Sequence, residues 1–147
     1  PSRFLDRDDT LCQLLCRLGG MAAEETFVGH WDLGASDDFD VAVVLARYIL
    51  TNIAMGDLGL HGIVRSRMRE ESEPDTALEA MVAQLLERCR RLAGDIFKTH
   101  EPVLLKLARE LELREDLEQD DVDRILAGVV IDRKAIVQQM LAPPAGS

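Results

Sequence analysis

The chain has 147 residues, of which 47% are hydrophobic, 30% charged and 4% aromatic, and its formal net charge is −10. This length suits one domain, and the composition is that of an ordinary soluble globular protein. Nucleic acids and anionic membranes require clustered Lys and Arg, so the acidic balance argues against both partners. No apolar run approaches the roughly 18 residues of a membrane span, so no membrane segment is expected in this chain.

The first predicted helix begins at Asp8 and Asp9 and loosens near Gly29. The paired glycines Gly19 and Gly20 fall inside it and predict close backbone approach to a neighbouring element, since glycine costs helix stability. Its apolar side carries Leu11, Leu14, Leu15, Leu18 and Ala22.

The stretch GASDDFDVAVVLARYILTNIAMG, residues 34–56, predicts the most buried helix. Ser36 stands before Asp37 and Asp38, which indicates a helix start: a hydroxyl that can cap N–H groups, then negative charge at the positive end of the dipole. Apolar side chains then follow two faces of the helix. One face carries Phe39, Ala42, Ala46, Ile49 and Ile53, and the other carries Val41, Val44, Tyr48 and Met55. A helix that is apolar around most of its circumference is buried, so other helices should pack around it.

Residues 56–72 contain three glycines and a charged run, which predicts a mobile surface loop. Pro74 then opens the longest helix, from about Asp75 to His100. Its apolar stripe consists of Leu78, Met81, Val82, Leu85, Cys89, Leu92, Ala93 and Ile96. The opposite, charged face is expected to be solvated.

Three shorter elements complete the chain. Pro102 starts a helix that should place Leu104, Leu107, Ala108 and Leu111 inside. A turn and a short helix with an acidic start then bury Val122, Ile125 and Leu126. Asp132 is the expected cap of a last short helix. The sequence therefore predicts an all-α domain of five or six helices, built around the buried helix at about residues 37–55.

Most motifs that carry chemistry are missing from the sequence. There is no GxxxxGK[ST] loop, no GxGxxG turn after a strand and no GxSxG elbow, so no nucleotide or cofactor site is predicted in this chain. His100 and Glu101 begin like the metalloprotease motif H-E-x-x-H, but Leu104 occupies its fifth position. His30, His61 and His100 are expected to be solvated.

The cysteines allow two interpretations. Cys12 and Cys16 lie one helical turn apart, a spacing that also suits a pair of metal ligands. No Cys-x-x-Cys motif or nearby His supports such a site, so these two residues and Cys89 are interpreted as small core residues of a protein in a reducing compartment.

Asp37 and Asp38 also allow two interpretations from the residues alone. Acidic side chains in the first turn of a helix stabilise the helix dipole. A carboxylate fixed at the start of a rigid helix is, alternatively, a well-oriented metal ligand.

Two blocks of the sequence resemble the peptidase domain of the FtsH family, membrane-anchored ATP-dependent zinc metalloproteases. LCRLGGMAAEETFVG, residues 15–29, is similar to the family's LLGGRAAEE–(L)VFG segment. Residues 34–56 are similar to the family's GAxNDLxxATxLARxMVTxxGMS. Downstream, HEPVLLKLARELELREDLEQDDVDRIL follows the family's closing pattern of helices. The resemblance covers about residues 4–128. It implies that residues 1–128 are the C-terminal part of such a peptidase domain and that 129–147 are a short helix and tail.

The resemblance also implies a zinc site. In the family, two histidines of an H-E-x-x-H helix and the aspartate of GAxND hold Zn²⁺, and this aspartate falls on Asp38. Asp37 replaces the family Asn and would tune the site without binding the metal. Met21, Val41, Val43 and Val44 replace polar or charged family residues, which should make the surface more apolar.

The H-E-x-x-H helix, and the ATPase module that would bind ATP and Mg²⁺, do not occur in this sequence. We therefore expect no catalytic residue here and no zinc binding or peptide cleavage by this chain alone. The parent protein would be a hexameric enzyme at the cytoplasmic face of a membrane that degrades unfolded or membrane proteins. The alternative is a non-catalytic helical module for assembly or regulation.

Overall fold

The computed structural model describes residues 6–30, 36–53 and 76–142. Within these ranges the chain forms α1 (Arg7–Phe27), α2 (Ser36–Tyr48), η2 (Ile49–Ile53), α5 (Thr76–Thr99), α6 (Glu101–Arg114), α7 (Gln119–Ile125) and α8 (Arg133–Leu141). η2 is a π-helical turn that continues α2, and the described ranges contain no strand. The all-α fold is confirmed. Among the described residues, no helix is long and apolar enough to cross a membrane.

Local signals explain where several helices start. The Asp6 carboxylate accepts a hydrogen bond from the Asp9 N–H at 2.7 Å, so α1 is capped just before the acidic pair expected to begin it. Asp132 accepts from the Ala135 N–H at 3.2 Å, which confirms the predicted cap of α8. Pro102 lies in the first turn of α6, also as predicted.

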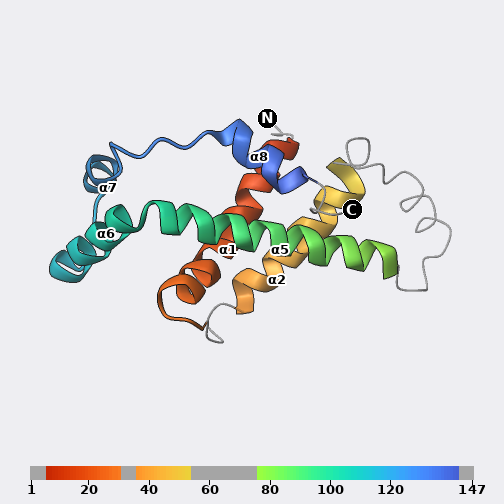
Figure 1. The fold of residues 1–147 in the computed structure, drawn as a ribbon, viewed down its shortest axis with the longest axis horizontal. Coiled ribbons are helices and arrows are strands. Elements are labelled where there is room, and N and C mark those ends of the chain that lie inside the picture. Colours follow the sequence, from red (N-terminus) through yellow and green to blue (C-terminus); the bar gives the residue numbers. More distant parts are fainter. Residues whose placement is uncertain (1–5, 31–35, 54–75, 143–147) are drawn as a thin grey trace.

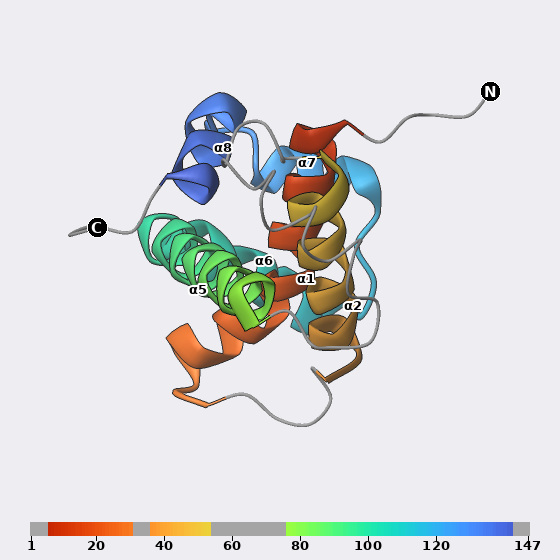
Figure 2. The same ribbon diagram turned by 90° about the vertical axis from the view of Figure 1, so that its right-hand side faces the viewer.

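The core is formed where α1 and α2 pack on α5. Figure 1 shows α5 running along the molecule, with α1 and α2 crossing it and α8 on the same side as the N-terminal end of α1. Figure 2, which looks nearly along α5, shows α1, α2 and α8 arranged around this helix. The fully buried side chains of this core include Leu11, Leu14, Ala42, Ala46, Ile49, Leu85, Cys89 and Met140. The apolar stripes predicted for α1 and α5 are thus the faces that pack.

α2 is buried on one face only. Ala42, Ala46 and Ile49 are inaccessible to solvent, whereas Val44 is 63% exposed. Phe39, Val41 and Tyr48 are exposed as well. The prediction of burial around most of the helix is therefore wrong: among the described helices α1 and α5 pack against α2, and the residues of α2 that they leave buried lie on one face.

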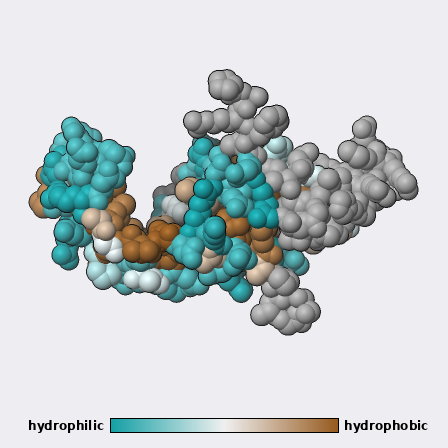
Figure 3. Space-filling view, turned by 90° about the horizontal axis from the view of Figure 1, so that it is seen from above, coloured by the Kyte–Doolittle hydropathy of each residue, from teal (hydrophilic) through white to brown (hydrophobic). Residues whose placement is uncertain are grey.

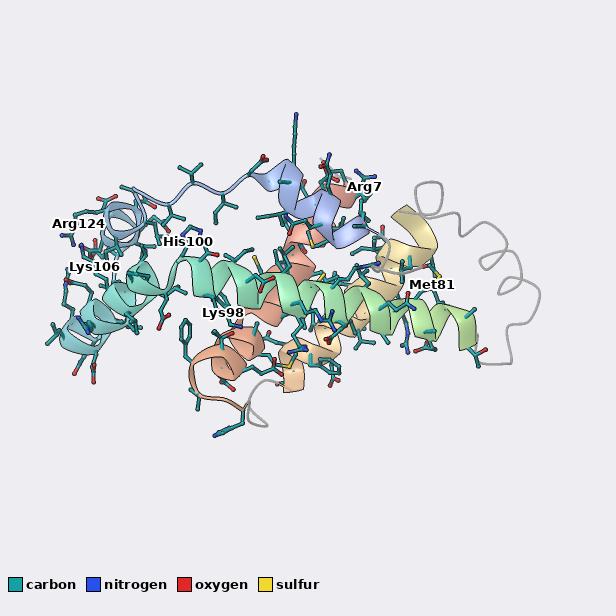
Figure 4. The ribbon with its side chains drawn as sticks, in the orientation of Figure 1. Arg7, Met81, Lys98, His100, Lys106 and Arg124 are labelled. Carbon is teal, nitrogen blue, oxygen red and sulfur yellow. The ribbon has the colours of Figure 1, made fainter. Side chains whose placement is uncertain are left out.

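α6 and α7 form an arm, residues 101–125, that projects beyond the core (Figure 1). No residue of α6 is buried, and Leu111 is 48% exposed, so the predicted inward face of α6 is wrong. The reason is that α6 contacts chiefly α7 and the end of α5. Ile125 of α7 is buried as predicted, while Leu126 is exposed. Figure 4 shows His100 where α5 meets the arm.

The two glycines of α1 are not sites of close packing. A Cβ atom at Gly19 would meet Phe97 at 3.6 Å, an ordinary van der Waals distance, and one at Gly20 would meet nothing within 4 Å. The predicted close backbone approach is therefore wrong. The predictions for residues 56–72, for Pro74 and for the Ser36 side chain lie outside what the structure describes.

The cysteines differ in burial. Cys89 is buried in the core, Cys12 is half-buried and Cys16 is exposed, so the core assignment is right for Cys89 and wrong for Cys16. Burial raises the pKa of the Cys89 thiol to about 12. The folded chain therefore keeps this thiol protonated at neutral pH.

Leu85→Ala should lower the free energy of unfolding by about 2–5 kcal/mol, because it leaves a cavity where a side chain with no exposed surface packed. Leu113→Ala is the matched control. Leu113 is 81% exposed, so the same change should alter the free energy by about 0.5 kcal/mol or less. Urea unfolding measures both, and equal losses would contradict the assigned core.

A thiol-reactive disulfide reagent at neutral pH should label Cys16 rapidly and leave Cys89 unlabelled until denaturant is added. Cys16→Ser should remove the fast phase of labelling, and rapid labelling of Cys89 in the native state would contradict its burial.

The raised pKa of Cys89 also predicts that the free energy of unfolding depends on pH. The contribution of protonated Cys89 is complete below the unfolded thiol's pKa of about 8.5 and is lost as pH rises toward about 12. Urea unfolding at a series of pH values measures this loss.

Candidate functional site

Asp38 lies in the first turn of α2, on the face that packs against α1. It precedes Ala42 by four residues and Ala46 by eight, so it continues the buried column of the helix to its N-terminal end. The Asp38 side chain itself is 54% exposed. Packing in the core thus fixes the backbone of the first turns of α2, while the Asp38 carboxylate remains accessible to solvent.

A cation from the neighbouring helix contacts this carboxylate. Nη1 of Arg17, on α1, donates a hydrogen bond to Oδ1 of Asp38 at 3.2 Å. Arg17 is 53% exposed, so the pair lies at the surface and contributes little to stability. It nevertheless joins two helices whose residues are 21 positions apart in the sequence.

Asp37 occupies a different face of α2. It precedes Val41 by four residues and Val44 by seven, both of which are exposed. Asp37 is itself exposed. The structure thus separates two carboxylates that are adjacent in the sequence: Asp38 is next to α1, and Asp37 begins the exposed apolar face of α2.

A second ion pair fixes the other end of α2 against α5. Arg47 donates from Nε to Oε1 of Glu79 at 3.0 Å and from Nη2 to Oε2 at 2.9 Å. This two-point contact raises the pKa of Arg47, chiefly through the hydrogen bonds to Glu79. α2 is therefore tied to α1 near its first turn and to α5 near its last.

The described residues do not form a complete metal site. Among residues 6–30, 36–53 and 76–142, no three His, Cys, Asp or Glu side chains lie together so as to hold an ion. His30 is exposed and His100 is half-buried where α5 meets α6, while His61 lies outside the described residues. Asp38 therefore fits zinc as a single oxygen ligand only, and other ligands would have to come from elsewhere.

Met21 is a core residue rather than a surface one. It is 7% exposed and belongs to the buried cluster between the helices, so its expected effect on the surface is wrong. The exposed positions Val41 and Val44 do make the surface more apolar, as predicted, whereas Val43 is partly buried and packs against the core.

Two hollows were not predicted from the sequence. An apolar groove of about 510 Å³ lies between α1, the end of α5 and the start of α8. Its lining includes Cys12, Cys16, Gly19, Gly20, Phe97 and Ile131. Figure 3 shows apolar surface in the notch between the arm and the body. A sequence signal for this groove is the series of small residues along one side of α1: Cys12, Cys16, Gly19 and Gly20.

The second hollow, of about 330 Å³, is charged and lies between α1 and α5. Arg90 in its wall binds Glu25 across the helices and Glu87 on its own helix. The hydrogen bond from Arg90 is the main cause of the lowered pKa of Glu87. This part of α5 was predicted to be solvated, and Arg90 is instead a half-buried bridge to α1. Its partner Glu25 is 65 positions away, a contact that helical periodicity does not reveal.

Comparison with known proteins gives a family for this arrangement. Residues 2–125 match the model of peptidase family M41. The chain is 34% identical over 126 residues to the ATP-dependent zinc metalloprotease FtsH 2 of Symbiobacterium thermophilum, a match that covers 82% of this chain and 22% of that protein. It is 35% identical over 120 residues to the ATP-dependent zinc metalloprotease FTSH 11, chloroplastic/mitochondrial, of Arabidopsis thaliana, covering 78% and 15%.

A third relative, the ATP-dependent zinc metalloprotease FtsH of Mycoplasmoides gallisepticum, is 31% identical over 129 residues, covering 81% of this chain and 17% of that protein. No solved structure matches the chain significantly. The chain thus spans between 15% and 22% of the length of these three relatives. The family model matches most of the chain and confirms the resemblance to the FtsH family: the chain belongs to peptidase family M41.

Proposed function

We propose that this chain is the C-terminal part of the peptidase domain of an ATP-dependent zinc metalloendopeptidase, and that it supplies Asp38 as the third zinc ligand. The observation that carries the proposal is the position of Asp38, exposed at the end of the buried column of α2 and held by Arg17. Family membership supports it, because the relatives are named zinc metalloproteases.

The chemistry of zinc explains why one carboxylate is useful but insufficient. Catalytic zinc takes three protein ligands and leaves a fourth position for water, which the bound metal makes acidic enough to serve as a nucleophile. Asp38 would provide one oxygen ligand and one negative charge toward the dication. Asp37 would act from outside the ligand set through its charge, since it lies on the neighbouring face of α2. The histidine ligands and the glutamate base would come from an H-E-x-x-H helix.

Family membership is the support for the remaining features that we propose for the enzyme. We propose that the parent protein degrades unfolded or membrane proteins, uses ATP and Mg²⁺ in an ATPase module, and assembles as a hexamer at the cytoplasmic face of a membrane. Residues 1–128 would be the peptidase part and 129–147 an appended helix and tail. α8, in the second part, contributes Val137 and Met140 to the core.

A non-catalytic helical module is the second candidate. It is favoured by the finding that the described residues bring no three potential ligands together. The coding sequence upstream of Pro1 separates the two candidates. An H-E-x-x-H motif there supports the protease, and a coding sequence that starts near Pro1 supports the module.

The isolated chain should bind zinc weakly or not at all, because a single exposed carboxylate does not make a zinc site. Isothermal titration calorimetry of the purified chain with Zn²⁺ measures this. A single tight site with a stoichiometry of one would show that the chain holds zinc without the H-E-x-x-H helix.

In the full-length protein, Asp38→Asn should abolish stoichiometric zinc binding and peptide cleavage, because a neutral amide replaces a charged ligand. Asp37→Asn, which restores the family residue at the adjacent position, should keep both. Metal analysis by mass spectrometry and hydrolysis of an unfolded protein substrate measure the two properties. Full zinc content in the Asp38→Asn variant would exclude Asp38 as a ligand.

A further inference from the structure

We infer that Arg17 is a positioning residue for the zinc ligand Asp38, holding the carboxylate in the orientation that the metal requires. The inference rests on the proposed function. It assigns a role to Arg17, which is not itself a metal ligand and which lies on α1, outside the motif around Asp38.

The backbone around Arg17 is fixed by the core. Leu14 and Leu18, on either side of it in α1, are buried with at most 1% exposure. Arg17 points instead toward the first turn of α2, where its Nη1 atom meets Oδ1 of Asp38 at 3.2 Å. Because the helix backbone at Arg17 is fixed, its guanidinium can donate only within a limited region. The hydrogen bond therefore restricts the orientation of the Asp38 carboxylate.

Asp38 is an exposed side chain in the first turn of a helix. Asp37 and Asp40 are exposed as well, but they lie on other faces of α2. Without a cation nearby, an exposed Asp side chain at a helix start is free to change rotamer or to turn back toward the helix N–H groups. Arg17 gives Asp38 a partner on the neighbouring helix.

The contact with Arg17 is compatible with binding of a metal by Asp38 through a single oxygen. The hydrogen bond from Arg17 uses Oδ1, and a carboxylate that binds zinc through one atom needs only the other oxygen, Oδ2. Ligating carboxylates are themselves usually hydrogen-bonded, and loss of such a partner typically costs 10–100-fold in metal affinity. Because the pair is half-exposed, we expect an effect at the lower end of this range at Arg17, about tenfold.

The test measures zinc affinity of the full-length protein by competition with a chromophoric chelator. Arg17→Met removes the charge and the donors but keeps an apolar stem, and it should weaken zinc binding by about tenfold. Arg17→Lys keeps a cation and should recover part of that loss. Arg124→Met is the matched control. Arg124 is likewise an exposed arginine paired with an aspartate, Asp121 at 3.4 Å, but it lies on the arm (Figure 4), so its loss should leave zinc affinity unchanged.

Asp38→Asn, measured alongside, separates the failure of this inference from failure of the proposed function. If Asp38→Asn loses zinc while Arg17→Met binds it with unchanged or tighter affinity, Arg17 does not position the ligand, and the proposed function stands. If Asp38→Asn keeps zinc, the proposed function itself fails and the role of Arg17 fails with it. Circular dichroism checks that each variant is folded. Should Arg17→Met not fold, Arg17→Ala takes its place, because it also removes the charge and the donors: zinc affinity equal to that of the unaltered protein would overturn the inference.

Discussion

The packing of α2 against α1 is the constraint on which the proposed site depends. Ala42 and Ala46 form the buried column of α2, and their small side chains allow the two helices to lie close together. Asp38 stands one turn further along the same column, where the packed face meets solvent. The position of a candidate ligand is therefore set by alanines in the core, and its orientation by Arg17 on the facing helix.

The rest of the fold supports this helix pair. α5 closes the core beneath both helices and holds the last turn of α2 through the Arg47–Glu79 contact. α8 covers the α1–α5 junction with Val137 and Met140. The arm lies outside this core and has its own contact, the ion pair between Arg114 and Asp121 at 2.9 Å. Changes in the arm should therefore act little on Asp38, whereas changes in the column of α2 should displace it.

Sequence periodicity predicted the helices well and their surroundings less well. The stripes of α1 and α5 are regular, so they identified the faces that pack. α2 and α6 are also rich in apolar residues, but periodicity cannot show how many neighbours a helix has. Val44 and Leu111 are consequently exposed where burial was expected. Asp38 was singled out by the family motif, whereas its contact with Arg17 depends on how α1 and α2 cross, which no local pattern encodes.

The most direct test of the proposed zinc site is a crystal structure of the full-length protein with zinc bound, with the metal located by anomalous scattering at the zinc absorption edge. We expect one Asp38 oxygen at about 2.0–2.2 Å from the zinc, with Arg17 on the other oxygen of the same carboxylate. Zinc bound without Asp38, or bound through Asp37 in its place, would contradict it.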